Sequence, residues 1–154
     1  MSITKLNNLS VSALTALPSG LGGKVLQVKE ASDGTARTTT STSFVTASNT
    51  LSVSITPSSA SNKVLIFANI TYSYSSSGRI DFTFFRGATN IAPVSSFVAN
   101  HSGSVEMPVS FMFLDSPSST SALTYQVYWR MSSGTGNMNA TNNLSTIHCL
   151  EIAG

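Results

Sequence analysis

Hydrophobic and polar residues alternate along most of this chain, in short runs rich in Val, Ile, Thr, Phe and Tyr. Clusters of Gly, Pro, Asn or Ser bound each run. This pattern is typical of antiparallel β-strands that bury one face. We expect strands over residues 23–30, 43–47, 50–57, 63–75, 79–87, 104–115, 122–131 and 145–154.

The alternation also predicts which side chains of a strand face the core. The predicted inward residues include Leu51, Val53, Ile55, Ile80, Phe82, Phe84, Tyr125, Val127, Trp129 and Met131. In the strand over 122–131, the opposite face carries long polar side chains, which is unusual for simple contact with water. Its residues Gln126, Tyr128 and Arg130 are therefore candidates for a trimer interface.

Short connections join the predicted strands, with turn-forming residues at 32–35, 57–62, 75–78, 115–121 and 132–137. Outside the first 22 residues, no window sustains the period of a capped helix. Strands with such uneven connections fit a jelly roll, while the Cys and Trp pattern of an immunoglobulin core is absent. The sequence therefore predicts an all-β, antiparallel jelly-roll β-sandwich as a head domain over residues 23–154.

Residues 1–22 have a different pattern, because they are apolar and Lys5 is their only charged residue. Taken alone, such an arm fits a disordered leader, an amphipathic helix, or an extended segment that adds to another subunit's sheet. The spacing sustains no heptad, and LSVSA at 9–13 alternates like a strand, so we expect an extended N-terminal anchoring arm with PSGLGG at 18–23 as its hinge. Burying its aliphatic side chains against a partner contributes on the order of 10 kcal/mol before ordering costs. The partner-binding residues are expected to be Ile3, Leu6, Leu9, Val11, Leu14 and Leu17.

The composition narrows the classes of partner. A chain of 154 residues suffices for one head domain, and 41% hydrophobic residues with only 9% charged residues argue against intrinsic disorder. The net charge of +2 comes from Lys and Arg residues without a cluster, so we expect no nucleic-acid partner. Neither a signal peptide nor a membrane-spanning run is apparent, so we expect no membrane partner and synthesis in a cytoplasm.

Candidate catalytic residues are few. No GxSxG nucleophile motif accompanies His101 or His148. We expect His148 to be a strand residue packed or hydrogen-bonded at its imidazole and His101 to be a solvated loop residue; a place on a trimer axis is the alternative for either. Cys149 lies in an alternating run and is expected to be a small buried residue, neither a disulfide partner nor a zinc ligand. We therefore expect no enzymatic activity and no cofactor.

Two binding chemistries also bear on function. Hard cations need several oxygen ligands in one place, and the spacing of the acidic residues provides none, so we expect no metal site. A carbohydrate surface would use exposed aromatic rings, but the alternation places most rings in the core. The acidic residues are expected to be solvated or salt-bridged on strands; they are Glu30, Asp33, Asp81, Glu106, Asp115 and Glu151.

Five ordered blocks are distributed from one end of the chain to the other: ITKLNNLSVSALTALPSGLGGKVLQV (3–28), LSVSITPSSASNKVLI (51–66), FRGATNIA (85–92), FLDSPSSTSALTYQVYW (113–129) and IHCLEIAG (147–154). They resemble a domain that recurs in virion proteins of tailed phages, especially phages of marine and freshwater bacteria, including cyanobacteria. Proteins of this type are described as tail-fibre, receptor-binding or virion structural proteins. The resemblance implies a virion structural protein with a homotrimeric jelly roll similar to the tumour-necrosis-factor-like fold, and it brings no catalytic residues.

Two structural roles follow from these expectations. A capsid decoration, or cement, protein would use its arm to clasp neighbouring capsid subunits, whereas a tail-fibre or receptor-binding tip would bind a host surface glycan. Because the sequence has no room for a fibre shaft before the head, decoration is preferred. An enzyme acting on surface polysaccharide is disfavoured, since no pair of carboxylates has a defined spacing. We expect a protein of the virion, made in the host bacterial cytoplasm, whose partners are other capsid or tail subunits.

Overall fold

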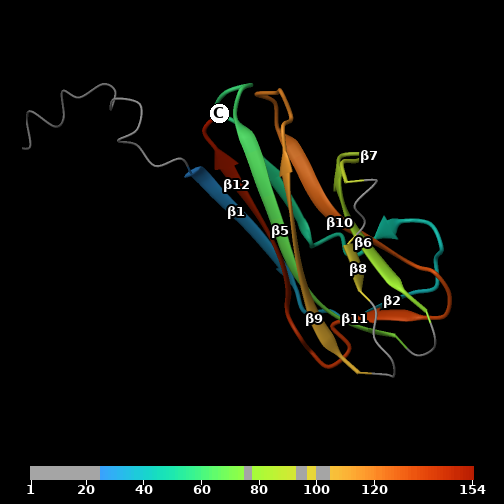
Figure 1. Ribbon diagram of the computed structural model, residues 1–154. Coiled ribbons are helices and arrows are strands. Elements are labelled where there is room, and N and C mark those ends of the chain that lie inside the picture. The colour runs from blue at the N-terminus through green and yellow to red at the C-terminus, as the bar shows by residue number, and fades with distance from the viewer. Residues whose placement is uncertain (1–24, 75–77, 93–96, 100–104) are drawn as a thin grey trace, which may run out of the picture.

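The computed structural model describes residues 25–74, 78–92, 97–99 and 105–154. Within these ranges every regular element is a β-strand, and the strands form two antiparallel sheets arranged as two layers (Figure 1). The predicted arm over 1–22, the boundary that follows it and His101 lie outside the described residues. The predictions made for them stay predictions.

Sheet A is built around β5 (Lys63–Tyr74), the longest strand of the domain. One edge of β5 pairs with β9, and the other pairs first with β12 and then, at its end, with β11. β1 pairs with β12, and β2 pairs with β11. The bounds of these strands are β1 (Val25–Asp33), β2 (Arg37–Thr39), β9 (Met107–Asp115), β11 (Gly136–Met138) and β12 (Ser145–Ile152).

Sheet B has β10 (Leu123–Met131) and β6 (Ile80–Arg86) at its centre, paired with each other. The outer edge of β10 pairs with β3 and β4, and the outer edge of β6 pairs with β7 and β8. These four strands are β3 (Val45–Thr46), β4 (Ser52–Ile55), β7 (Thr89–Asn90) and β8 (Phe97–Ala99).

The order of the strands defines a jelly roll. Sheet A has the order β1, β12, β5, β9, and sheet B has the order β4, β10, β6, β8. The chain passes from one sheet to the other between β2 and β3, β4 and β5, β5 and β6, β8 and β9, β9 and β10, and β10 and β11. This repeated crossing between two antiparallel sheets is the jelly-roll arrangement. The predicted fold class is therefore confirmed.

The core lies between the two sheets and contains the residues that the alternation predicted. Trp129, Tyr125, Phe82 and Phe84 are among the largest fully buried side chains. Phe111 of sheet A packs on Phe82 and Phe84, with ring centroids 5.6 and 5.0 Å away. Aromatic packing of this kind fills the space between the layers. The other predicted inward residues are also buried; they are Leu51, Val53, Ile55, Ile80, Val127 and Met131.

The structure differs from the predicted elements in two respects. The strands β2, β7, β8 and β11 were not predicted, because two or three residues are too few to display a period. The expectation that each strand buries one face is wrong for β6. Asp81 and Thr83 on its second face are buried as well, since Arg130 pairs with Asp81 and Asn90 accepts a hydrogen bond from Thr83.

Candidate interaction surface

The outward face of sheet B carries the three residues predicted for a trimer interface. Gln126, Tyr128 and Arg130 are half-buried, and each has a partner within its own chain. The Tyr128 ring stacks on Phe85 with centroids 3.9 Å apart, and Arg130 Nε donates to Asp81 Oδ2 at 2.9 Å. These contacts engage the Tyr128 ring and the Arg130 guanidinium within the chain, and the role of the three residues in a trimer stays a prediction.

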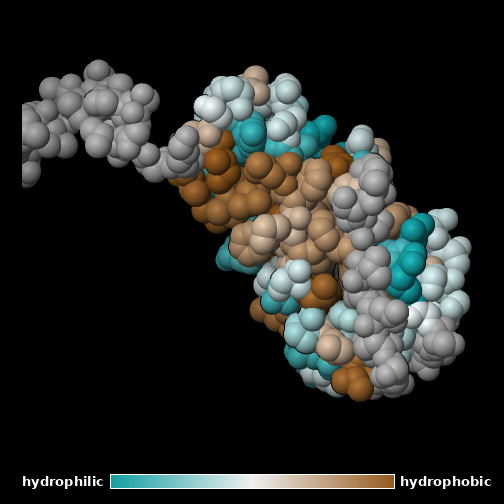
Figure 2. Space-filling model, viewed as in Figure 1, coloured by the Kyte–Doolittle hydropathy of each residue, from teal (hydrophilic) through white to brown (hydrophobic). Residues whose placement is uncertain are grey.

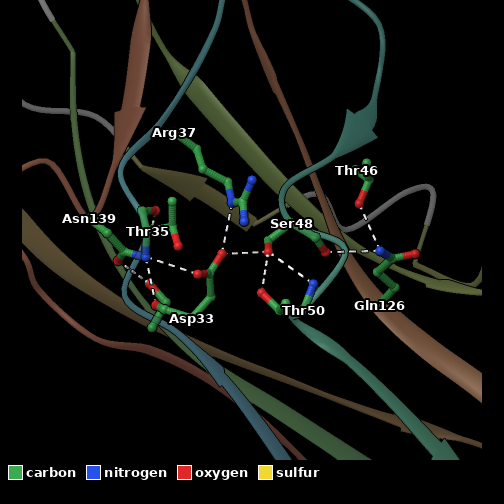
Figure 3. Close-up of polar contacts among 9 residues, drawn as sticks. Asp33, Thr35, Arg37, Thr46, Ser48, Thr50, Gln126 and Asn139 are labelled. Carbon is green, nitrogen blue, oxygen red and sulfur yellow. Dashed lines mark hydrogen bonds and ion pairs between the residues drawn. The ribbon is translucent and has the colours of Figure 1, made fainter.

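Gln126 belongs to a chain of hydrogen bonds that joins the two sheets (Figure 3). Its amide donates to Thr46 Oγ1 at 2.8 Å and to the Ser48 carbonyl at 2.9 Å. The Ser48 hydroxyl donates in turn to the carboxylate of Asp33, at the end of β1. Arg37 Nε donates to the same carboxylate at 2.7 Å (Figure 3). The network fixes the loop around Ser48 between the sheets.

Four acidic residues are buried: Asp33, Asp81, Asp115 and Glu151. Burial opposes the ionisation of Asp33, but hydrogen bonds from Ser48, Arg37 and Thr35 outweigh it and hold its pKa well below the usual range. Salt bridges pair Asp33, Asp81 and Asp115 with arginines, as predicted. Glu151 is buried and is held instead by hydrogen bonds from Gln27, Ser58 and Asn62, all distant in sequence, so the expectation of a solvated or salt-bridged carboxylate is wrong for this residue.

The outward face of sheet A has a different chemistry. Within the described residues no element packs over this face, and its surface is apolar across several strands (Figure 2). Met112 is 66% exposed, and Phe67 is 37% exposed. We call this surface the apolar face; it comprises Val25, Leu26, Val28, Leu65, Phe67, Met112, Leu114, Leu150 and Ile152. Contiguous exposed patches of this kind mark interaction sites.

The strand register builds this surface from two rows of side chains that run across the sheet. Cross-strand partners point to the same side of a sheet, so a chain of paired residues forms a row. The first row is Val28, Leu150, Leu65 and Leu114, and the second is Glu30, His148, Phe67 and Met112. The next row is polar and consists of Ser32, Thr146, Asn69 and Ser110. The apolar face is therefore a band with a polar border.

His148 lies in the middle of the second row. Its imidazole stacks on Phe67 with ring centroids 4.6 Å apart, and its Nδ1 lies 3.5 Å from Glu30 Oε2. This confirms that His148 is a strand residue packed by its neighbours. A pocket of about 340 Å³ adjoins it at the β1 edge. Its lining consists of Glu30, Ala31, Ser32, Leu144, Thr146 and His148.

Sequence reasoning missed the apolar face, although the sequence contained a signal. In VLIF at 64–67 and FMFL at 111–114, apolar residues occupy the positions on both faces of the predicted strand. Such runs predict strands covered on both sides. Val64 and Ile66 face the core, whereas Leu65 and Phe67 are their outward neighbours. The outward apolar residues of these strands contribute to the apolar face.

The described residues contain no group of three or more metal-ligating side chains, and no helix there has the length and apolarity to cross a membrane. Cys149 is buried, as predicted, and burial raises the pKa of its thiol to about 12. A neutral, enclosed thiol is unsuited to nucleophilic chemistry at ordinary pH.

No protein-family model and no curated protein matches the chain. Among solved structures, the chain is similar to the crystal structure of the infectious bursal disease virus VP2 subviral particle, with a TM-score of 0.48, 10% identity, and coverage of 83% of this chain and 38% of that chain. It is also similar to the crystal structure of the T13 particle of the same virus, with a TM-score of 0.43, 9% identity, and coverage of 85% of this chain and 36% of that one. The chain spans little more than a third of the length of these proteins. The assignment of the jelly roll rests on strand order and register.

Proposed function

We propose that this protein is a structural subunit of a tailed-phage virion, and specifically a homotrimeric capsid decoration, or cement, protein whose apolar N-terminal arm clasps neighbouring subunits. The observation that carries the proposal is the uncovered apolar face of sheet A. A head with such a face gains free energy when another protein covers it, since each Å² of apolar surface removed from water contributes about 25 cal/mol. The protein is proposed to have no enzymatic activity.

The surface chemistry of the head supports a permanent structural contact. Interfaces between stable subunits have an apolar centre, few charges and a polar border. The first row of the apolar face carries no charge, the second carries Glu30 at one end, and a polar row follows. Met and aromatic side chains, which are enriched in such interfaces, occupy the second row as Phe67 and Met112.

The test is to add the purified full chain to particles of its source phage that lack it, and to map the added density by electron cryo-microscopy. Density arrayed over the shell is expected for a decoration protein. Density confined to the tail would overturn the decoration role and favour the alternative, a tail-fibre or receptor-binding module that recognises a host surface glycan.

A variant without residues 1–20 tests the anchoring role of the arm. Among the described residues, the buried core between the two sheets is contributed by Ala47 and later residues, so the shortened chain is expected to fold. Circular dichroism checks the folding. A folded head that no longer attaches to particles is the expected result, whereas a folded head that attaches normally would contradict the clasp.

A further inference from the structure

We propose that the apolar face of sheet A is the docking site for residues 3–17 of a neighbouring copy of this chain. The inference rests on the proposed function and deepens it by naming one partner of that face. In this arrangement the N-terminal segment of each subunit covers the sheet of the next and links the subunits.

The first argument is position. β1 begins at Val25, which pairs with Ile152 at the apolar end of the face, while Ser32 and Asp33 lie at the polar end. The preceding residues therefore join the head beside the apolar rows. Val25 and Leu26 are themselves exposed and continue the apolar surface toward that junction. Subunits placed side by side on a shell bring this junction in one copy close to the face of another.

The second argument is chemical complementarity. Residues 3–17 contain six aliphatic residues named above and a single charge, Lys5. The two rows of the apolar face likewise contain one carboxylate, Glu30, which is mostly exposed. Lys63 lies beyond them, as the partner of Ile152 at the apolar end of the face. An apolar segment with one cation thus meets two largely apolar rows that carry one carboxylate, and few charges lose contact with water when the segment binds.

The third argument is shape. The pocket of about 340 Å³ beside His148 and Leu144 is concave and borders the second row. A projecting aliphatic side chain of an extended segment fills such a hollow, and anchors of this kind dominate the energy of interfaces. A segment can place one such side chain in the hollow while its main chain lies along the neighbouring rows. The pocket therefore favours a segment over face-to-face packing of two sheets.

The fourth argument is the free edge of β1. Among the described residues β1 pairs only with β12, so its outer edge presents main-chain hydrogen-bonding groups. An extended segment can add to such an edge. Fifteen extended residues span about 50 Å, and the main strands of sheet A cover roughly 15 Å across. The segment is long enough to follow the edge or to cross the face.

Disulfide cross-linking in the full chain tests this arrangement. Cys149 is the only cysteine of the sequence and is buried, so introduced thiols are the reactive ones. Chains carrying one cysteine in the segment, scanned as Ile3→Cys, Leu6→Cys, Leu9→Cys, Val11→Cys, Leu14→Cys and Leu17→Cys, are co-expressed with chains carrying Met112→Cys and a tag of different mass. The control partner is Thr124→Cys, an exposed position on the opposite sheet.

The expected result is a covalent heterodimer with Met112→Cys for at least one segment position, at several times the yield obtained with Thr124→Cys. Equal yields would overturn the inference. Cross-links between two Met112→Cys chains in preference to the segment would assign the face to a second head. An intrachain disulfide as the main product of the double variant Leu14→Cys, Met112→Cys would assign it to the segment of the same chain. Both outcomes exclude the proposal.

Attachment to particles is measured separately on the same variants under reducing conditions. A chain that attaches to the shell without cross-linking between copies would refute the docking inference and leave the proposed function standing. A chain that cross-links between copies but attaches to no particle would support the docking inference and contradict the proposed function.

Discussion

The hydroxyl of Tyr125 donates a hydrogen bond to Oδ2 of Asp115 at 2.7 Å. Tyr125 lies in β10 and Asp115 ends β9, so the bond connects sheet B to sheet A inside the molecule. Arg86 Nη1 donates to the same oxygen at 2.6 Å. Burial and the adjacent carboxylate raise the pKa of Tyr125, which keeps the phenol protonated as the donor.

This contact predicts an order of stabilities. Tyr125→Phe removes one donor while Arg86 still satisfies the carboxylate, and we expect a loss of about 1 kcal/mol in the free energy of unfolding. Asp115→Asn leaves Arg86 without its counter-charge and is expected to cost about 2–3 kcal/mol. Urea unfolding measures both. A Tyr125→Phe variant that loses as much as Asp115→Asn would contradict this reading.

Glu151 predicts a dependence of stability on pH. It is buried in β12, and its carboxylate accepts hydrogen bonds from Gln27, Asn62 and Ser58. Burial opposes its ionisation, but these bonds outweigh the cost and lower its pKa from 4.5 to about 2. Because the unfolded chain binds this proton more tightly, the stabilisation is complete above about pH 5 and is lost as the pH falls towards 2.

Replacing Glu151 isolates this contribution. Glu151→Gln is expected to lower the free energy of unfolding by about 2 kcal/mol at pH 7 and to flatten its decline between pH 5 and pH 2. Urea unfolding at several pH values measures the two curves. Curves that stay parallel across this range would show that another group, such as Asp33, carries the dependence.

Gly136 in β11 lies against the core so closely that it tolerates no side chain. A Cβ there would lie 2.6 Å from Met131 Sδ and 3.0 Å from Ile80 Cδ1, and both of those residues are buried. We expect Gly136→Ala to cost about 1–3 kcal/mol through overpacking. Gly34→Ala is the control, since its Cβ meets nothing nearer than 3.7 Å. Thermal unfolding should separate the two variants, and equal melting temperatures would refute the close approach.

The apolar face predicts an effect on association without an effect on folding. Met112→Asp places a charge in the second row, and Ser110→Asp places the same charge on the same strand and face but in the polar row. We expect Met112→Asp to weaken self-association of the full chain at least tenfold and Ser110→Asp to change it little. Sedimentation velocity measures association. Both variants should unfold as the parent does, since both positions are exposed.

The Cys149 thiol is expected to be inert in the folded protein. Its burial and its pKa of about 12 leave little thiolate at pH 8, so iodoacetamide should modify it only after unfolding. Mass spectrometry with and without urea reports the labelling. Rapid modification of the native chain would show that β12 opens readily.

The strands were predictable because their pattern is local. The period of two in LSVSI at 51–55 or YQVYWRM at 125–131 requires only neighbours in sequence, and the core formed from those residues as predicted. The burial of Asp81 and Glu151 was not predictable. Their donors lie as far away in sequence as Gln27 from Glu151, and no local pattern reveals that distant groups will surround a carboxylate.

The candidate interaction surface was also predictable only where its pattern is local. The sequence indicated that Leu65 and Met112 are apolar residues in an outward phase, but the row that joins Val28, Leu150, Leu65 and Leu114 exists only through the register of four strands. Polar residues at Gln126 and Arg130 suggested an interface on the other sheet, since their partners within the chain were not visible in the sequence. The contacts of the arm stay predictions, because its residues lie outside those described.

The place of β12 sets an order of events during folding. β12 lies between β5 and β1, and in the described residues β1 has no other strand to pair with. A chain that has made residues 25–144 can form the β5–β9 and β6–β10 pairs, but it offers β1 no template. β1 can therefore join sheet A only after residues 145–152 are in place. A chain cut short before residue 145 would leave β1 unpaired at one end of the domain, so the strand made first is the one fixed last.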